Sequence, residues 1–148
     1  MIKIQHEDFD LGQEAAALHA SGVGAVVTFT GLVRDYASAG SVTAIELEHF
    51  PGMTGKSLAA IEAEARERWP LSGVSIIHRI GKLAAGEQIV LVAVSAAHRQ
   101  AAFEAAMFLM DYLKTRAPFW KKEWVNGQAQ WVEAKPSDQA AAARWQTD

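Results

Sequence analysis

The stretch "HRQAAFEAAMFLMDYLKTRAPFWKKEW", residues 98–124, decides how the rest of the chain is arranged. Residues 98–117 predict one long helix that is apolar on nearly every side, so we expect it to be central and buried. Pro118 cannot continue that helix and ends it. The residues after it alternate between two faces of a predicted strand, with Phe119, Lys121 and Glu123 on one face and Trp120, Lys122 and Trp124 on the other.

Two further strands are predicted directly before the long helix, over residues 73–81 and 87–96, joined by the loop 82–86. Their β-branched residues and short connection favour antiparallel pairing. After the helix, residues 119–125 and 128–134 predict a hairpin, because Asn126-Gly127 is a strong turn signal. The remaining strands are predicted over 1–5, 22–34 and 42–50, the remaining helices over 10–20, 51–69 and 136–145, and a loop over 36–41.

Several of these strands follow one another without a helix between them, which favours antiparallel neighbours. We therefore predict an α+β fold, with a mostly antiparallel sheet packed with helices, and not a doubly wound fold. Residues 1–148 suit one hydrophobic core, so a single domain is expected. No apolar run approaches the ~18 residues that span a bilayer, and the N-terminus lacks the apolar middle of a signal peptide. We expect a cytoplasmic protein that makes no use of membranes.

The composition excludes several kinds of chemistry. The chain has no cysteine, which rules out disulfides, thiolate metal sites and cysteine nucleophiles, so any sulfur in its chemistry must arrive on another molecule. None of its five histidines stands in a close ligand pattern, so we predict no metal and no cofactor. No dinucleotide-binding loop, Walker loop, nucleophile elbow or serine triad is present.

Charge is unevenly spread along the chain. The formal net charge is −3, yet residues 98–124 contain five lysines and arginines against three carboxylates. A local positive field on an acidic protein indicates a small anionic ligand or an acidic chain terminus, and not a long nucleic acid.

Lys121 is the first candidate for chemistry in this basic segment. Loss of water lowers the pKa of a lysine, a second amine such as Lys114 lowers it further, and a carboxylate such as Glu123 raises it. A lysine tuned in this way can serve as an acid, a base or a nucleophile. By spacing alone a structural role is the more common one: Lys114 would complement the helix dipole, while Lys121 and Lys122 would solvate an edge strand.

Other candidates lie at the ends of predicted elements. His98 and Arg99 open the long helix, where backbone N–H groups attract anions. Arg34 closes the strand 22–34 and could clamp a phosphate with its planar guanidinium. Each of these residues could equally be an ordinary surface residue, and His78-Arg79, in mid-strand, is interpreted as structural.

Six segments together resemble one known family. They are "AVVTFTGLVR", "LEHFPGMT", "RWPL", "IHRIG", "AHR" at the start of the long helix, and "FLMDYLKTRAPFWKKE". They closely resemble the catalytic (large) subunit of molybdopterin synthase, the MoaE family, over about Gly24 to Trp145. The resemblance implies an α/β-hammerhead-like arrangement with a small C-terminal hairpin subdomain.

The resemblance also implies a reaction and its partners. Members of this family are sulfurtransferases of molybdenum cofactor biosynthesis that convert cyclic pyranopterin monophosphate to the dithiolene of molybdopterin. Two sulfurs arrive in turn from a small ubiquitin-like carrier protein, whose C-terminal Gly-Gly ends in a thiocarboxylate. The expected assembly is a homodimer within a heterotetramer, with one carrier at each end.

Site residues follow from the same motifs. Lys114 and Lys121 resemble the catalytic pair of the family. The substrate-binding set would comprise Leu32, Val33, Arg34, His98, Arg99, Lys114, Lys121, Lys122 and Glu123. Leu32 stands where the family often has lysine, so only its backbone is expected to line the pocket. Lys135 is the candidate for a basic residue that reaches a neighbouring protomer's pocket.

The resemblance suggests a division of labour. Arg34, His98 and Arg99 would hold phosphate and pterin. Lys121 would stabilise or protonate the oxygen leaving the ring carbon, and Lys114 would meet the thiocarboxylate.

Two other functions are compatible with the sequence. A nucleotide or single-strand nucleic-acid binding module could use residues 114–124 as a stacking platform, although the acidic total charge weighs against it. A non-catalytic assembly subunit could use the lysines only to dock an acidic partner tail.

Overall fold

The structure is a computed structural model that describes residues 1–37, 40–133 and 135–146. Its strands are β1 (Ile2–Gln5), β2 (Ala25–Leu32), β3 (Tyr36–Ala37), β4 (Gly40–His49), β5 (Leu71–Arg79), β6 (Gly81–Ala84), β7 (Gln88–Ala96), β8 (Phe119–Val125) and β9 (Gln128–Val132). Its helices are α1 (Leu11–Ala16), α2 (Met53–Arg68), α3 (Arg99–Arg116) and α4 (Pro136–Ala143). Among these described helices, none has the length and apolar character needed to cross a membrane.

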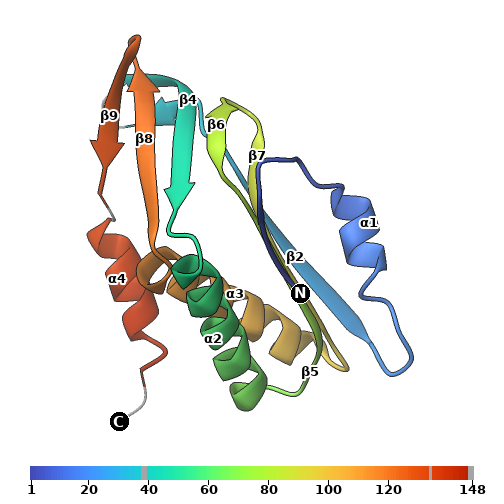
Figure 1. The fold of residues 1–148 in the computed structure, drawn as a ribbon. Helices are drawn as coiled ribbons and strands as arrows, with labels where there is room; N and C mark the ends of the chain where they lie inside the picture. The colour runs from blue at the N-terminus through green and yellow to red at the C-terminus, as the bar shows by residue number, and fades with distance from the viewer. Residues whose placement is uncertain (38–39, 134, 147–148) are drawn as a thin grey trace.

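The strands form two sheets, which lie side by side in Figure 1. The first sheet has the strand order β1-β5-β7-β2. The second sheet has the order β3-β4-β8-β9, with β6 also paired to β4. Only the β1–β5 pair is parallel among the described pairs, so the prediction of a mostly antiparallel α+β fold is confirmed.

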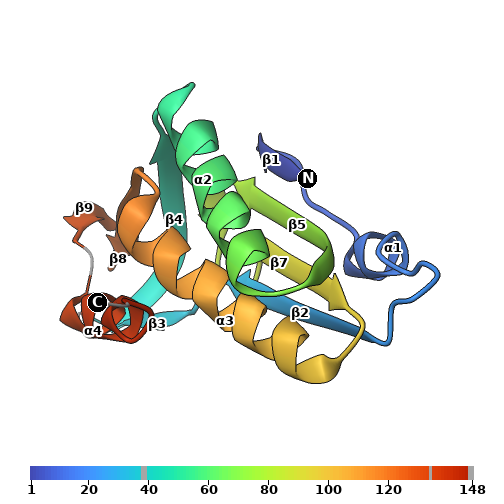
Figure 2. The same cartoon turned by 90° about the horizontal axis from the view of Figure 1, so that it is seen from below.

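Helices cover the first sheet on both faces. α2 and α3 lie across one face, as Figure 2 shows, and enclose a core that includes Ile76 and Val92. The opposite face buries Ile77 and Leu91 against Phe9 and Leu18, next to α1. This explains why β5 and β7 are apolar along nearly their whole length, since a strand covered on both faces has no solvent side.

The second sheet has its own smaller core. Val33, Val42, Ile45, Leu47, Leu83 and Val125 are buried together there. β8 occupies the middle of this sheet, between β4 and β9, so the C-terminal hairpin extends the sheet. The predicted turn is confirmed, because Asn126 and Gly127 both have positive φ, at 53° and 79°, as a type I′ hairpin requires.

Three expectations about local structure were wrong. The first is that α3 is not buried all round: Phe103 and Met107 are 62% and 51% exposed, because α3 packs on one side of the sheet only. The second concerns the two predicted loops, 36–41 and 82–86, each of which contains part of a strand. β3 lies within the first loop, and β6 covers the beginning of the second. Both pair with β4, so distant pairing overrides their weak local signal. The third is that the helix predicted over 10–20 ends at Ala16, where α1 stops; Asp10 caps the start of α1 by accepting a hydrogen bond from the Gln13 N–H at 2.9 Å.

Candidate active site

A cavity of about 520 Å³ opens where the two sheets meet. Its walls come from the end of β2, the last turns of α3, the start of β8 and the segment between β9 and α4. The charged side chains lining it are Arg34, Lys114, Lys121, Lys135, Glu123, Glu133 and Asp138. Four cations against three carboxylates leave one net positive charge in the cavity, which suits a ligand that carries negative charge.

Two of the three lysines of the basic segment line this cavity. Lys114 lies in the last turn of α3 and Lys121 lies on β8, and both line the hollow. Burial lowers the pKa of Lys121, the positive charge of Lys114 lowers it further, and Glu123 opposes these effects. The pKa of Lys121 is therefore displaced in the direction that an amine needs to exchange protons near neutral pH.

His78 also lines the cavity, which the sequence reasoning missed. Its ring is 5% exposed and stacks on Phe119, with centroids 3.8 Å apart and planes 16° apart. Nδ1 lies 2.8 Å from the carbonyl oxygen of Arg79, so Nδ1 carries the hydrogen and donates it. Burial lowers the pKa of His78 to about 4, and the charges of Lys114 and His49 contribute to that shift.

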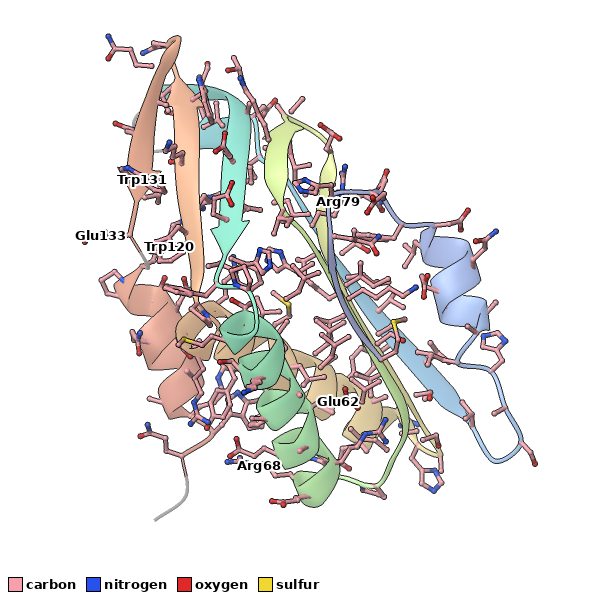
Figure 3. All side chains as sticks on the ribbon, in the orientation of Figure 1. Glu62, Arg68, Arg79, Trp120, Trp131 and Glu133 are labelled. Atoms are coloured by element: carbon pink, nitrogen blue, oxygen red, sulfur yellow. The ribbon has the colours of Figure 1, made fainter. Side chains whose placement is uncertain are left out.

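The alternation of β5 could have revealed this position. Val74, Ile76 and His78 share the face that α2 and α3 cover, so His78 continues that row toward the end of α3. Its neighbour Arg79 points to the other face and is structural, as predicted (Figure 3): its Nε donates to the His6 carbonyl at 3.0 Å and its Nη1 to the Gln88 carbonyl at 2.9 Å.

The end of β2 forms the second wall. Leu32, Val33 and Arg34 all line the cavity, as expected. The register with β7 shifts between Gly31 and Leu32 at this wall, an irregularity common beside active sites. Thr30 lines the same wall, and its buried hydroxyl oxygen has no hydrogen-bond partner among the described residues.

His98 and Arg99 lie away from the cavity. They stand at the start of α3, whereas Lys114 is in its last turn. At ~1.5 Å per residue, the helix separates Arg99 from Lys114 by roughly 22 Å. Neither residue lines the cavity, so one chain does not bring them to Arg34 as the proposed division of labour requires.

Lys122 was also expected in the site but lies on the opposite face of β8. Its Nζ sits 4.5 Å from the ring centroid of Trp131, and the Nζ of Lys82 sits 4.2 Å from that of Trp124. Figure 3 shows Trp120 and Trp131 on this outer side of the hairpin. The chain's own lysines therefore occupy one face each of Trp124 and Trp131, which leaves less aromatic surface open for stacking with bases.

Lys135 lines the cavity of its own chain, close enough to Lys121 to contribute to the lowered pKa of that lysine. It was expected to reach a neighbouring protomer. Among the described residues, no group of three or more histidine, aspartate or glutamate side chains could hold a metal ion.

The fold and the cavity define a class of protein: an α+β protein with a cavity lined by lysine side chains where two sheets meet. The sequence profile of the family described as "MoaE protein" matches residues 4–116. The chain belongs to the MoaE family.

The descriptions of similar proteins agree with this family assignment. A molybdopterin synthase catalytic subunit of Pseudomonas aeruginosa is 57% identical over 147 residues, with 98% of each chain covered. The protein of the same description from Escherichia coli is 55% identical over 145 residues, with 97% of each chain covered. The chain is thus an enzyme subunit of molybdenum cofactor biosynthesis, in a family that transfers sulfur.

Solved structures have the same fold. Molybdopterin cofactor biosynthesis protein E from Burkholderia multivorans has a TM-score of 0.82 at 52% identity, covering 97% of this chain and 94% of that one. Molybdopterin synthase from Staphylococcus aureus has a TM-score of 0.83 at 35% identity, covering 88% of this chain and 96% of that one.

Proposed function

We propose that the chain transfers two sulfurs, one after the other, to cyclic pyranopterin monophosphate and so produces the dithiolene of molybdopterin. The sulfur donor in this proposal is the C-terminal thiocarboxylate of a small ubiquitin-like carrier subunit. The observation that carries the proposal is the meeting of Lys114 and Lys121 in one partly desolvated cavity.

The chemistry of the cavity supports an anionic donor and an anionic substrate. A thiocarboxylate and a phosphate are both negative at neutral pH, and the amines lining the hollow would attract both. In this proposal the ammonium of Lys114 holds the charge of the thiocarboxylate. Lys121, with its lowered pKa, gives a proton to the oxygen that leaves the ring carbon as sulfur attacks.

The absence of cysteine supports delivery by a carrier. With no thiol in the chain, sulfur cannot rest on a protein side chain as a cysteine persulfide. The relatives are described as catalytic subunits, which implies that their enzymes contain another subunit. An extended Gly-Gly tail is slender enough to enter a hollow of about 520 Å³ beside the free edge of β2.

The proposal also requires a second copy of this chain. His98 and Arg99 lie roughly 22 Å along α3 from Lys114. If they bind the phosphate, they must do so in the cavity of a neighbouring protomer. The proposed assembly is therefore a homodimer of this chain with one carrier at each end.

Reconstitution tests the reaction. The purified chain is mixed with thiocarboxylated carrier and cyclic pyranopterin monophosphate, and dithiolene product is assayed. Lys114→Ala and Lys121→Ala should each abolish product while the circular dichroism spectrum is retained, and Lys82→Ala, on the outer face, should remain active. A fully active Lys114→Ala/Lys121→Ala double variant would refute the proposal. Product formed with a carrier that ends in an ordinary carboxylate would refute the proposed sulfur source.

A further inference from the structure

The two lysines belong to parts of the molecule that are built separately. α3 packs against β2, β7, α2 and α4, so the core of the first sheet positions the backbone of Lys114. β8 packs against β4 and β9, so the second sheet positions the backbone of Lys121. The chain passes from α3 to β8 through residues 117–119, which we call the junction.

The junction is a tight turn. The N–H of Phe119 donates to the carbonyl of Ala117 at 3.0 Å, the bond of a γ-turn centred on Pro118. A short rigid turn fixes where β8 begins relative to the end of α3. Small changes in it would therefore be carried directly into the spacing of Lys114 and Lys121.

Thr54 holds the backbone of the junction. Its side chain is fully buried, and its hydroxyl donates to the carbonyl of Pro118 at 2.9 Å. The same oxygen accepts a hydrogen bond from the N–H of Phe50, also at 2.9 Å. One hydroxyl in the first turn of α2 thus ties the end of β4 to the turn between the two lysines.

His78 holds the side chain of the junction. Its ring lies flat on Phe119 at 3.8 Å, and its own orientation is fixed by the bond from Nδ1–H to the Arg79 carbonyl at 2.8 Å. Phe119 is also paired with His49 across the β4–β8 ladder. The contact anchors the first residue of β8 to β5, which belongs to the first sheet.

We propose that Thr54 and His78 are positioning residues that hold the junction so that Lys114 and Lys121 share one cavity. The two contacts are independent: one restrains the backbone at Pro118 and the other the side chain of Phe119. Both come from elements outside α3 and β8. Neither residue need touch the substrate for this role, and the inference rests on the proposed function only for its activity readout.

A second readout does not depend on turnover. The rate at which an acylating reagent modifies Lys121, followed by mass spectrometry as a function of pH, reports the surroundings of that amine. The groups that surround Lys121 and set this profile are Lys114 on α3, His78 on β5, Glu123 on β8, Arg34 after β2, Glu133 and Lys135 between β9 and α4, and Asp138 in the first turn of α4. Moving β8 away from α3 shifts the profile toward that of an exposed lysine.

Thr54→Val and Thr54→Ser form a matched pair. Valine keeps the shape of threonine but removes both hydrogen bonds, whereas serine keeps the hydroxyl. Thr54→Val should lower kcat at saturating substrate by about tenfold or more, with less change in KM, because misplaced groups cost turnover. Thr54→Val should also shift the pH dependence of Lys121 labelling to higher pH. Thr54→Ser should keep most of the wild-type kcat and of the wild-type labelling profile.

His78→Phe and His78→Asn form the second pair. Phenylalanine keeps a flat ring on Phe119, and asparagine keeps a donor for the Arg79 carbonyl but no ring. The labelling profile should shift more in His78→Asn than in His78→Phe. This pair carries the test alone if Thr54→Val does not fold.

Val94→Ala is the control for lost stability, since Val94 is fully buried in the first core and away from the junction. It should lower Tm and leave the profile and kcat of the folded protein unchanged. Wild-type labelling and kcat in both Thr54→Val and His78→Asn would overturn the inference, as would an equal shift in Val94→Ala. Those results would not contradict the proposed reaction, because the reaction is tested separately by the lysine variants and the carrier control.

Discussion

The two sheets of this protein differ in what their faces meet. The first sheet is covered by helices on one face and by α1 and its neighbouring segment on the other, and its central strands β5 and β7 are buried. The second sheet turns one face of β8 toward the cavity and the other toward solvent, where Trp131 is 62% exposed. The difference teaches that the first sheet supplies stability, while the second is free to carry charged groups for chemistry.

Adjacent lysines on β8 give the sharpest test of this division. Lys121 faces the cavity and Lys122 faces outward over Trp131. Lys121→Ala should lower the rate of dithiolene formation by ~10²-fold or more, the size expected for loss of a proton donor. Lys122→Ala should stay within a few-fold of wild type. Single-turnover assays would measure both rates, and equal losses in the two variants would contradict the assignment of faces.

Loss of stability should be larger for substitutions in the first sheet than for substitutions on the exposed face of the second. Leu91 is fully buried on β7, so Leu91→Ala should reduce the free energy of unfolding by about 2–5 kcal/mol. Trp131→Ala, on the exposed face of β9, should cost under about 1 kcal/mol. Urea unfolding followed by circular dichroism would compare them, and a larger loss in Trp131→Ala would mean that the second sheet also carries stability.

His78, where the two parts meet, should make stability depend on pH. Its pKa is about 4 in the folded protein against 6.5 when unfolded, so between these values only the unfolded chain binds the proton. Stability should therefore be lost as pH falls from about 6.5 to about 4, by up to about 3 kcal/mol from this group. His78→Phe should remove this contribution from the curve of unfolding free energy against pH. An unchanged pH dependence in that variant would show that other groups cause it.

The smallest effect is expected at the wall formed by the end of β2. Arg34→Ala should raise the KM for the pterin substrate by about tenfold with little change in kcat, because the arginine would bind substrate and transition state alike. Steady-state kinetics with saturating carrier would separate the two constants. A fall in kcat with unchanged KM would give Arg34 a role in the chemical step.

The elements with strong local patterns were predictable from sequence. α3, β5 and β7 follow from their apolar residues, and the hairpin follows from Asn126-Gly127. β3 and β6 were not predictable, because these short strands exist only through pairing with β4. Their residues lie far from β8 and β9 in the chain, so no local signal shows that β3 and β6 join the sheet of β4, β8 and β9.

The site was predictable in part for the same reason. Motif resemblance found Lys114, Lys121, Arg34 and Glu123, which line the cavity, although their catalytic and binding roles stay predictions. It wrongly included Lys122, although the alternation of residues 119–124 already put that lysine on the face opposite Lys121, and it omitted His78. Alternation separates the two faces of a strand, but which face meets the cavity depends on how the two sheets pack, through contacts such as that between Thr54 and Pro118.

The location of the cavity at the seam between two cores has an evolutionary consequence. If the junction acts as proposed, substitutions in residues 117–119 and Thr54 would change the catalytic rate, whereas substitutions inside either core would change thermal stability. Natural selection for robustness and selection for catalytic rate would then act on largely separate sets of positions. A lineage could adapt to a hotter or colder habitat without having to rebuild the arrangement of its two amines.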